Sequence, residues 1–328
     1  MVTRRQALWL LPVVVAIYMP MCAPAVRPTV QPWEAPLSEL WERPQDLAAG
    51  DLFNGPWGPE RAPDPRATYT FVRPKQGGVN PGVIVTDPQR RVWHVKQAPD
   101  GIRGAEGPVE VVVSRVLSAL GYHQPPVYFL PMFMMTDASG THAESGGRFR
   151  LEDPSLKGCG EWSWQENPFV NTRPYQGLLV ILRMFNSSDL KNSNNTIYEV
   201  QRNGVVQRWY VVRDLGLSLG EDGKYFQRRN NLALFERERF IDGIDDGFVV
   251  FPFAGQHGEL LRKRITPDDV GWAAALISGL SDRQWRDAFR AGGYEPAVAE
   301  RFIRKIRDNI AVARRIGGND LNTGLERR

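Results

Sequence analysis

Apolar and polar residues alternate with two different periods along this chain. Residues 83–86 and 92–96 are short runs rich in β-branched side chains, separated by an Asp-Pro turn, and residues 68–72 have a similar composition. Such runs predict antiparallel strands. Residues 108–120 instead place apolar side chains three and four positions apart, which predicts an amphipathic helix. The apolar run at 127–134 predicts one more strand.

The middle of the chain combines one apolar helix with one hairpin. Residues 137–171 are polar and irregular in pattern, and we interpret them as an insertion or a hinge. Residues 175–185 are mostly apolar and predict a buried helix. Residues 196–201 and 207–213 predict two strands, because Asn-Gly at 203–204 is a dipeptide typical of a tight hairpin turn.

Capping residues mark three helices towards the C-terminus. Thr266 is expected to cap one helix, and Ser281 a second through a capping box. A third helix is predicted over 296–314, with Gly317 and Gly318 ending it. Strands in the first half and helices in the second indicate an α+β fold.

Composition and charge indicate a globular protein and argue against nucleic-acid binding. The chain has 328 residues, of which 42% are hydrophobic and 24% charged, as in ordinary globular proteins. This length favours one two-lobed domain or two tightly joined halves. The formal net charge of +4 is small and no nucleic-acid-binding motif accompanies it, so no nucleic acid partner is expected. The four histidines are scattered, without the spacing of a zinc site.

The first residues have the pattern of an export signal. Arg4 and Arg5 precede an apolar run at 8–19, and small residues follow at 23–25. The apolar run is shorter than the roughly 20 residues that span a bilayer. We therefore predict that residues 1–25 direct export and that the mature protein is periplasmic or extracellular.

Two alternatives would keep the protein attached to a membrane. Cys22 offers a site for a lipid, and the N-terminal segment offers an uncleaved anchor. Removal of the leader would leave Cys159 as the single cysteine, so no internal disulfide is expected. Residues 26–67 are rich in Pro and Trp, and we interpret them as a tether that runs over the domain.

Two short motifs carry the most specific chemistry. A D-L-K-x-x-N motif begins at Asp189, and a D-L-G motif begins 25 residues later at Asp214. The first motif supplies a carboxylate that can accept a hydroxyl proton and a lysine, Lys191, that can neutralise a transferred group. Asn194, or Asn195 in a shifted register, and Asp214 supply oxygen atoms for a magnesium ion.

A lysine, an acidic residue and a glycine-rich turn precede these motifs in the order that phosphate binding requires. Lys96 ends a predicted strand, and Glu110 lies 14 residues later near the start of the next helix. We prefer Glu110 over Glu106 as the partner of the lysine, because it lies within the periodic helical segment. A turn that would let backbone N–H groups approach phosphates contains Gly77, Gly78 and Gly82.

Together these motifs resemble the protein-kinase-like superfamily, in the style of its atypical, secreted or HipA-like members. The resemblance covers about residues 68–315. It implies a two-lobed fold with a β-rich N-lobe at 68–135, a helical C-lobe at 136–318 and a tail at 319–328. It also implies a phosphotransferase that uses ATP and Mg²⁺.

The resemblance assigns a role to each candidate residue. Lys96, Glu110 and the glycine turn would bind the nucleotide, and Asp189 and Lys191 would be catalytic. The metal ligands would be Asn194 and Asp214.

The chain departs from the kinase pattern in ways that bear on activity. Ser187 and Ser188 stand where a His-Arg pair is expected, and no A-P-E motif follows. These departures leave the acceptor open among a protein, a sugar and a small molecule. They also leave open a catalytically silent relative that binds a nucleotide, or a glycan through its ten tryptophans.

A serine hydrolase is a further alternative. Residues 216–220 read G-x-S-x-G around Ser218, and an acid (Asp242, Asp245 or Asp246) and then His257 follow in the order that hydrolases use. The residues after Ser218 make a poor helix start, whereas a nucleophile elbow must lead into a helix. This hypothesis is therefore the weaker one.

Overall fold

The computed structural model describes residues 35–77, 80–99, 106–202, 204–220 and 229–323, with side chains up to 318. All of these described residues belong to one compact unit. The predicted leader and Gly78 lie outside the described residues. Among the helices that are described, none has the length and apolar character needed to cross a membrane.

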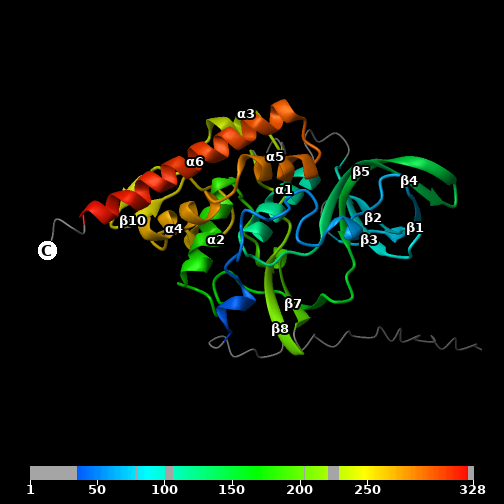
Figure 1. The fold of residues 1–328 in the computed structure, drawn as a ribbon, viewed down its shortest axis with the longest axis horizontal. Helices are drawn as coiled ribbons and strands as arrows, with labels where there is room; N and C mark the ends of the chain where they lie inside the picture. The colour runs from blue at the N-terminus through cyan, green and yellow to red at the C-terminus, as the bar shows by residue number, and fades with distance from the viewer. Residues whose placement is uncertain (1–34, 78–79, 100–105, 203, 221–228, 324–328) are drawn as a thin grey trace, which may run out of the picture. The chain divides into compact units, whose positions relative to one another are not determined.

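Five strands form a closed barrel in the order β1-β2-β3-β5-β4 (Figure 1). Their bounds are β1 (Thr68–Pro74), β2 (Gly82–Thr86), β3 (Val92–Gln97), β4 (Val127–Asp137) and β5 (Gly140–Leu151). Neighbouring strands are antiparallel, except that β1 and β4 close the barrel as a parallel pair. Aromatic side chains fill the interior, among them Tyr69, Trp93, Phe133 and Phe149. The predicted strands and the antiparallel pairing of β2 with β3 are confirmed.

The prediction that residues 137–171 are irregular is wrong, because this segment contains β5 and β6 (Lys157–Gly160). Gly146 and Gly147 lower the intrinsic strand propensity of β5. They are present because the neighbouring backbones come close: a Cβ on Gly146 would lie 2.3 Å from the Leu130 carbonyl oxygen. The lobe boundary predicted after residue 135 therefore falls within β4, which pairs with β5 on both sides of that position.

A second sheet follows the barrel in the chain and has the order β6-β7-β8. β7 (Asn195–Arg202) and β8 (Val205–Val212) form the predicted antiparallel hairpin, with Gly204 at a positive φ of 78°. β9 (Gly243–Asp245) and β10 (Phe248–Val250) make a short two-stranded sheet.

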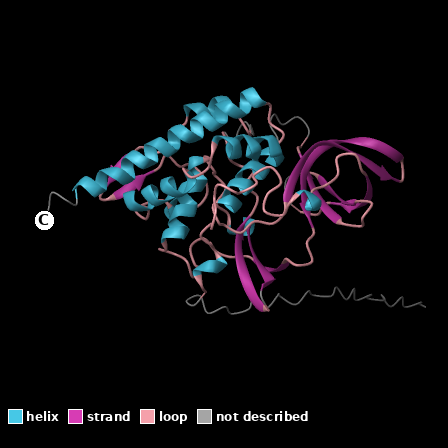
Figure 2. Ribbon diagram, viewed as in Figure 1, coloured by secondary structure: helices cyan, strands magenta, loops and turns pink. Residues whose placement is uncertain are grey.

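Helices dominate the chain after β8, while α1 lies between β3 and β4. The α-helices are α1 (Glu106–Ala119), α2 (Arg173–Met184), α3 (Leu232–Arg237), α4 (Pro267–Ile277), α5 (Asp282–Ala291) and α6 (Pro296–Thr323). Short 3₁₀ turns occur at Leu37–Glu39, Pro59–Arg61, Asn192–Asn194 and Gly258–Leu260. Thr266 and Ser281 cap α4 and α5 as predicted, and the capping box predicted for Ser281 is present at Thr266 as well. Figure 2 shows both kinds of element, which confirms the α+β class, and the division into two lobes stays a prediction.

The segment at 35–67 packs into the domain rather than only over it. Leu40 and Leu52 are buried in the core that α1, α2 and the C-terminal helices share. The indole Nε1 of Trp41 donates to the Leu120 carbonyl at 2.7 Å. The Gln284 side chain donates to the Leu47 carbonyl at 2.7 Å. This segment is therefore part of the fold.

The prediction that Gly317 and Gly318 end the last helix is wrong, because α6 continues to Thr323. Gly317 serves a packing role instead. A Cβ on Gly317 would lie 2.3 Å from the Cα of Gly271 in α4, so the two helices cross in near backbone contact. A Cβ on Gly318 would meet nothing within 4 Å.

Gly317→Ala should therefore destabilise the protein by about 1–3 kcal/mol, because the added methyl group forces α4 and α6 apart. Gly318→Ala is the matched control and should be neutral or stabilise by up to about 1 kcal/mol, since alanine favours a helix more than glycine does. Denaturant unfolding of both variants measures the difference. Equal stability of the two variants would contradict the crossing.

Candidate functional site

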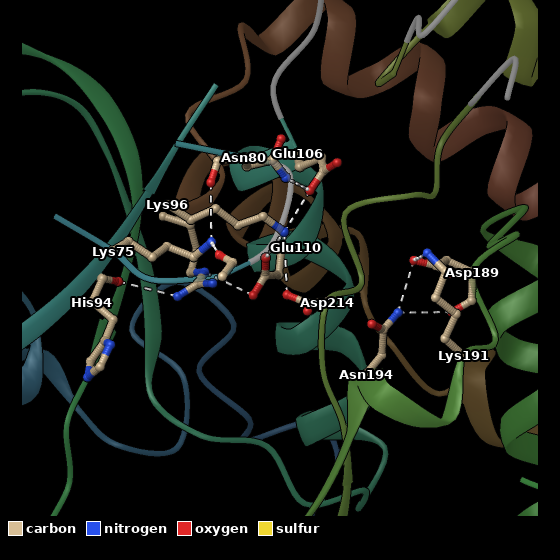
Figure 3. Close-up of polar contacts among 12 residues, drawn as sticks. Lys75, Asn80, His94, Lys96, Glu106, Glu110, Asp189, Lys191, Asn194 and Asp214 are labelled. Atoms are coloured by element: carbon tan, nitrogen blue, oxygen red, sulfur yellow. Dashed lines mark hydrogen bonds and ion pairs between the residues drawn. The ribbon is translucent and has the colours of Figure 1, made fainter. Parts of the chain in front are cut away.

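Lys96 lies at the end of β3 with its ammonium group among three carboxylates (Figure 3). Its Nζ is 2.6 Å from Glu106, 3.5 Å from Glu110 and 3.4 Å from Asp214. The lysine side chain is only 8% exposed. A buried ammonium group needs such partners, because an unpaired charge away from water costs several kcal/mol.

The two glutamates near Lys96 belong to different polar networks. Glu106, the first residue of α1, also accepts a hydrogen bond from the buried Asn80 at 2.6 Å and contacts Arg229. Glu110 lies one turn further and pairs with Arg148 of β5 at 2.9 Å. The lysine thus contacts Glu110, which the sequence favoured, but lies closer to Glu106.

Asp214 immediately follows Arg213 at the end of β8 and has a positive φ of 52°. Aspartate tolerates this left-handed conformation better than most residues do. Burial raises the pKa of the Asp214 carboxyl, but the positive charges of Lys96 and Arg148 lower it by more, so that its pKa lies below the ordinary value of 3.8. The carboxylate is therefore ionised at neutral pH.

Gly216 of the D-L-G motif has a steric reason. A Cβ at this position would lie 2.5 Å from the Cβ of Glu106. The backbone after Asp214 therefore approaches the start of α1 so closely that only glycine fits. This contact joins the motif to the carboxylate nearest Lys96.

Asp189 lies between α2 and β7 in a small polar group (Figure 3). Lys191 Nζ is 3.0 Å from its Oδ1, and Asn194 Nδ2 donates to its Oδ2 at 3.0 Å. The amide of the neighbouring Asn195 is fully buried and donates to the Trp162 carbonyl. The alternative register with Asn195 as the site residue therefore has no support here.

A cavity of about 460 Å³ joins these two groups. Of the candidate residues, Gly77, Lys96, Asp189, Lys191, Asn194 and Asp214 line it, whereas Glu110 and Gly82 do not. Among the described lining residues, seven are Lys or Arg and three are Asp or Glu. This excess of positive charge favours an anionic ligand.

The donor set of this cavity fits a magnesium ion held jointly with a ligand. Asn194 uses its amide nitrogen on Asp189, which leaves its Oδ1 for a cation. The Asp214 side chain is 46% exposed and uses one oxygen on Lys96. The described residues contain no group of three or more His, Cys, Asp or Glu side chains that would hold a metal unaided. Magnesium commonly takes only one or two carboxylates and completes its shell with phosphates and water.

Sequence reasoning missed the basic residues of this cavity. Arg148 and Arg150 reach it from β5, Arg213 from the residue before Asp214, and Lys75 and Arg229 from loops. The Arg-Phe-Arg alternation at 148–150 was a usable signal, since it places two arginines on one face and Phe149 in the barrel interior. Gly146 and Gly147, which precede it, have low strand propensity, so β5 was not predicted.

The residues of the alternative hypotheses lie elsewhere. Ser218 is fully buried and its Oγ has no hydrogen-bond partner in the described part of the chain. His257 contacts Gln165 and Glu259 instead. Every tryptophan that the structure describes is buried or half-buried, so these side chains do not form an exposed stacking surface for a glycan.

Comparison with known proteins yields a similar solved structure and no matching family. No family model matches the chain, and no curated protein matches it. Among solved structures, the Helicobacter pylori proinflammatory kinase CtkA is similar over 77% of this chain and 99% of its own, with 12% identity and a TM-score of 0.46. That neighbour is described as a kinase, it gives no specific support to the HipA-like branch, and at this level of similarity it decides neither the family nor the activity.

Lys96→Met should destabilise the protein by about 3 kcal/mol, because it leaves buried carboxylates without their shared cation. Adding Glu106→Gln should restore part of that loss, since it removes one of the unbalanced charges. Urea unfolding of the wild type, both single variants and the double variant measures the coupling. Strictly additive losses would show that the two side chains do not interact.

Asp214 should also contribute a pH-dependent stability. Its folded-state pKa is depressed, so its carboxylate stabilises the fold above pH 3.8, and this contribution is lost as the pH falls through the lower folded-state value. The stability gap between the wild type and Asp214→Asn should therefore be largest above about pH 4 and shrink below it. Urea unfolding across that range, with the exposed Asp246→Asn as control, measures the gap. A gap independent of pH would contradict the assignment.

Proposed function

We propose that this protein is a phosphotransferase of kinase-like fold that uses Mg-ATP and a hydroxyl acceptor. One observation carries the proposal. Lys96 from the barrel, Asp189 and Asn194 from the loop before β7, and Asp214 from the end of β8 line one cavity, although they are far apart in the sequence.

The charge of this cavity suits a polyphosphate. Phosphoryl transfer needs positioned positive charge around phosphate oxygens more than it needs covalent chemistry. Lys96 is held by carboxylates on several sides, which restricts its ammonium group to one place. Lys75 and Arg229 add positive charge at the same cavity.

Asn194 and Asp214 are the residues that would hold magnesium. The ion would neutralise charge on the phosphates when it is bound with the nucleotide. Both side chains keep an oxygen atom available for this role, as their remaining contacts show.

Asp189 is the residue that would accept the hydroxyl proton of the acceptor. Its carboxylate is oriented by the hydrogen bond from Asn194, and Lys191 supplies positive charge beside it. A general base needs such fixed placement within reach of the reacting hydroxyl group.

The acceptor stays open among a protein, a sugar and a small molecule, and the export predicted from residues 1–25 stays a prediction. A catalytically silent relative would use the same nucleotide site. This second hypothesis differs from the phosphotransferase hypothesis only in that Asp189 would not accept a proton from an acceptor.

Thermal unfolding with Mg-ATP tests the nucleotide site. At about 100 times its Kd, a ligand stabilises the folded state by about 2.7 kcal/mol, which raises the melting temperature clearly. The wild type and Asp246→Ala, whose carboxylate is exposed and paired with Lys263, should show this rise. Asp214→Ala should not. No rise in the wild type would refute the proposal.

The transfer step needs a separate variant. Asp189→Asn should keep the thermal shift, because it retains a polar side chain of similar size, but should lose ATP turnover measured as ADP release. Equal turnover in the wild type and Asp189→Asn would remove Asp189 from the mechanism. Binding without turnover in the wild type would favour the silent reading.

A further inference from the structure

A second cavity of about 280 Å³ adjoins the first and shares Lys75, Lys96, Arg148 and Arg150 with it. Five of its described lining residues are Lys or Arg, since Arg73 joins the four shared ones, and none is an acid. Gln76 and His94 are its other polar lining residues, and Ile84 and Val95 are its apolar ones.

Strand register builds this basic wall. Arg73 of β1 pairs with Ile84 of β2, Ile84 with His94 of β3, and His94 with Arg150 of β5. These four residues therefore form one row across four adjacent strands. Paired residues in a sheet point to the same face.

A parallel row lies two residues away on the same face. Gly82 of β2 pairs with Lys96 of β3, and Lys96 pairs with Arg148 of β5. Residues two apart in a strand share a face, so both rows face the cavity. Gly82 adds no side chain to this row, and the stem of Lys75 passes over it: a Cβ there would lie 3.2 Å from the Lys75 Cδ.

Several of these cations have no carboxylate partner in the described part of the chain. Lys96 and Arg148 are paired with acids. No ion pair involves Arg73, Lys75 or Arg150 among the described residues, and the Lys75 ammonium donates only to backbone carbonyls of Gly77 and Asn80.

The pKa shifts of two of these residues agree with an excess of positive charge, although Glu110 acts in the opposite direction on the pKa of Arg150 and Asp214 on that of Lys75. Burial lowers the pKa of Arg150 to about 10, and repulsion from Arg148 and Arg213 adds to the effect. Burial and the charge of Lys96 likewise lower the pKa of Lys75. Positive charges that destabilise one another are stabilised when an anion binds between them.

We propose that this pocket binds a phosphate-type anion, separate from the phosphates placed between Lys96 and Asp214. The protein would then bind two anionic groups at once, one in each cavity. The second centre belongs either to the nucleotide itself or to a phosphorylated acceptor bound beside it. The assignment depends on the charge and register of the pocket and does not require phosphoryl transfer.

Calorimetry with inorganic pyrophosphate in metal-free buffer, on the full chain, tests the pocket. Removing one or two charged donors should weaken binding by about 10–100-fold, so we expect that loss in Arg73→Gln/Arg150→Gln. Arg66→Gln is the matched control, because its side chain is 92% exposed before β1. Affinity in the double variant equal to that of the wild type, or no binding to the wild type, would overturn the proposal.

Thermal unfolding of the single variant Arg150→Gln separates loss of binding from loss of folding. Without ligand, this variant should melt at the same temperature as the wild type or higher, since it removes a charge that Arg148 and Arg213 repel. Pyrophosphate should raise the melting temperature of the wild type more than that of the variant. The proposed pocket would be contradicted if the unliganded variant melted at a lower temperature than the wild type while pyrophosphate raised both melting temperatures equally.

Adding Mg-ATP identifies the source of the anion. If pyrophosphate still binds to the protein saturated with Mg-ATP, the pocket serves a second molecule. If the two compete and Arg73→Gln weakens both, the nucleotide supplies the anion, because Arg73 lines the second cavity and not the first. Asp214→Ala should lose Mg-ATP binding but keep metal-free pyrophosphate binding, so that failure of the nucleotide site and failure of this pocket give different results.

Discussion

The burial of one ammonium group constrains the whole site. Lys96 is removed from water and needs compensating charge, which two carboxylates from α1 and one from the segment after β8 supply. Glu106 and Glu110 fix the start of α1 against β3, and Asp214 fixes the end of β8 against both. The close approach of Gly216 to Glu106 follows from the same arrangement. The barrel and the segment after β8 are thus held together by electrostatics as well as by packing.

Local signals predicted the elements whose pattern is self-contained. The hairpin of β7 and β8 follows from its Asn-Gly turn, and α4 and α5 follow from their capping residues. α1 follows from its apolar period, although it begins two residues before the predicted start. In each case the information lies within about a dozen neighbouring positions, which is the range that periodicity and turn chemistry cover.

Features set by distant neighbours could not be predicted in this way. β5 contains two glycines because the backbones of neighbouring strands come close to it, and Gly317 lies inside a helix because α4 crosses there. The sequence named Asp189, Asn194 and Asp214 through their motifs. It could not identify Glu106 as the nearer partner of Lys96, because that depends on how α1 packs against β3. It could not place Arg148 and Arg150 beside Lys96, because that depends on the register of β3 and β5.

The hydrogen bond from Gln284 to the Leu47 carbonyl joins residues 237 positions apart. A ribosome releases the N-terminal part of a chain first, so Leu47 emerges long before α5 exists. Contacts of such large sequence separation form late, since a long loop must close before they give any stabilisation. We therefore expect Leu40 and Leu52 to become buried in this core only after α4, α5 and α6 have been synthesised.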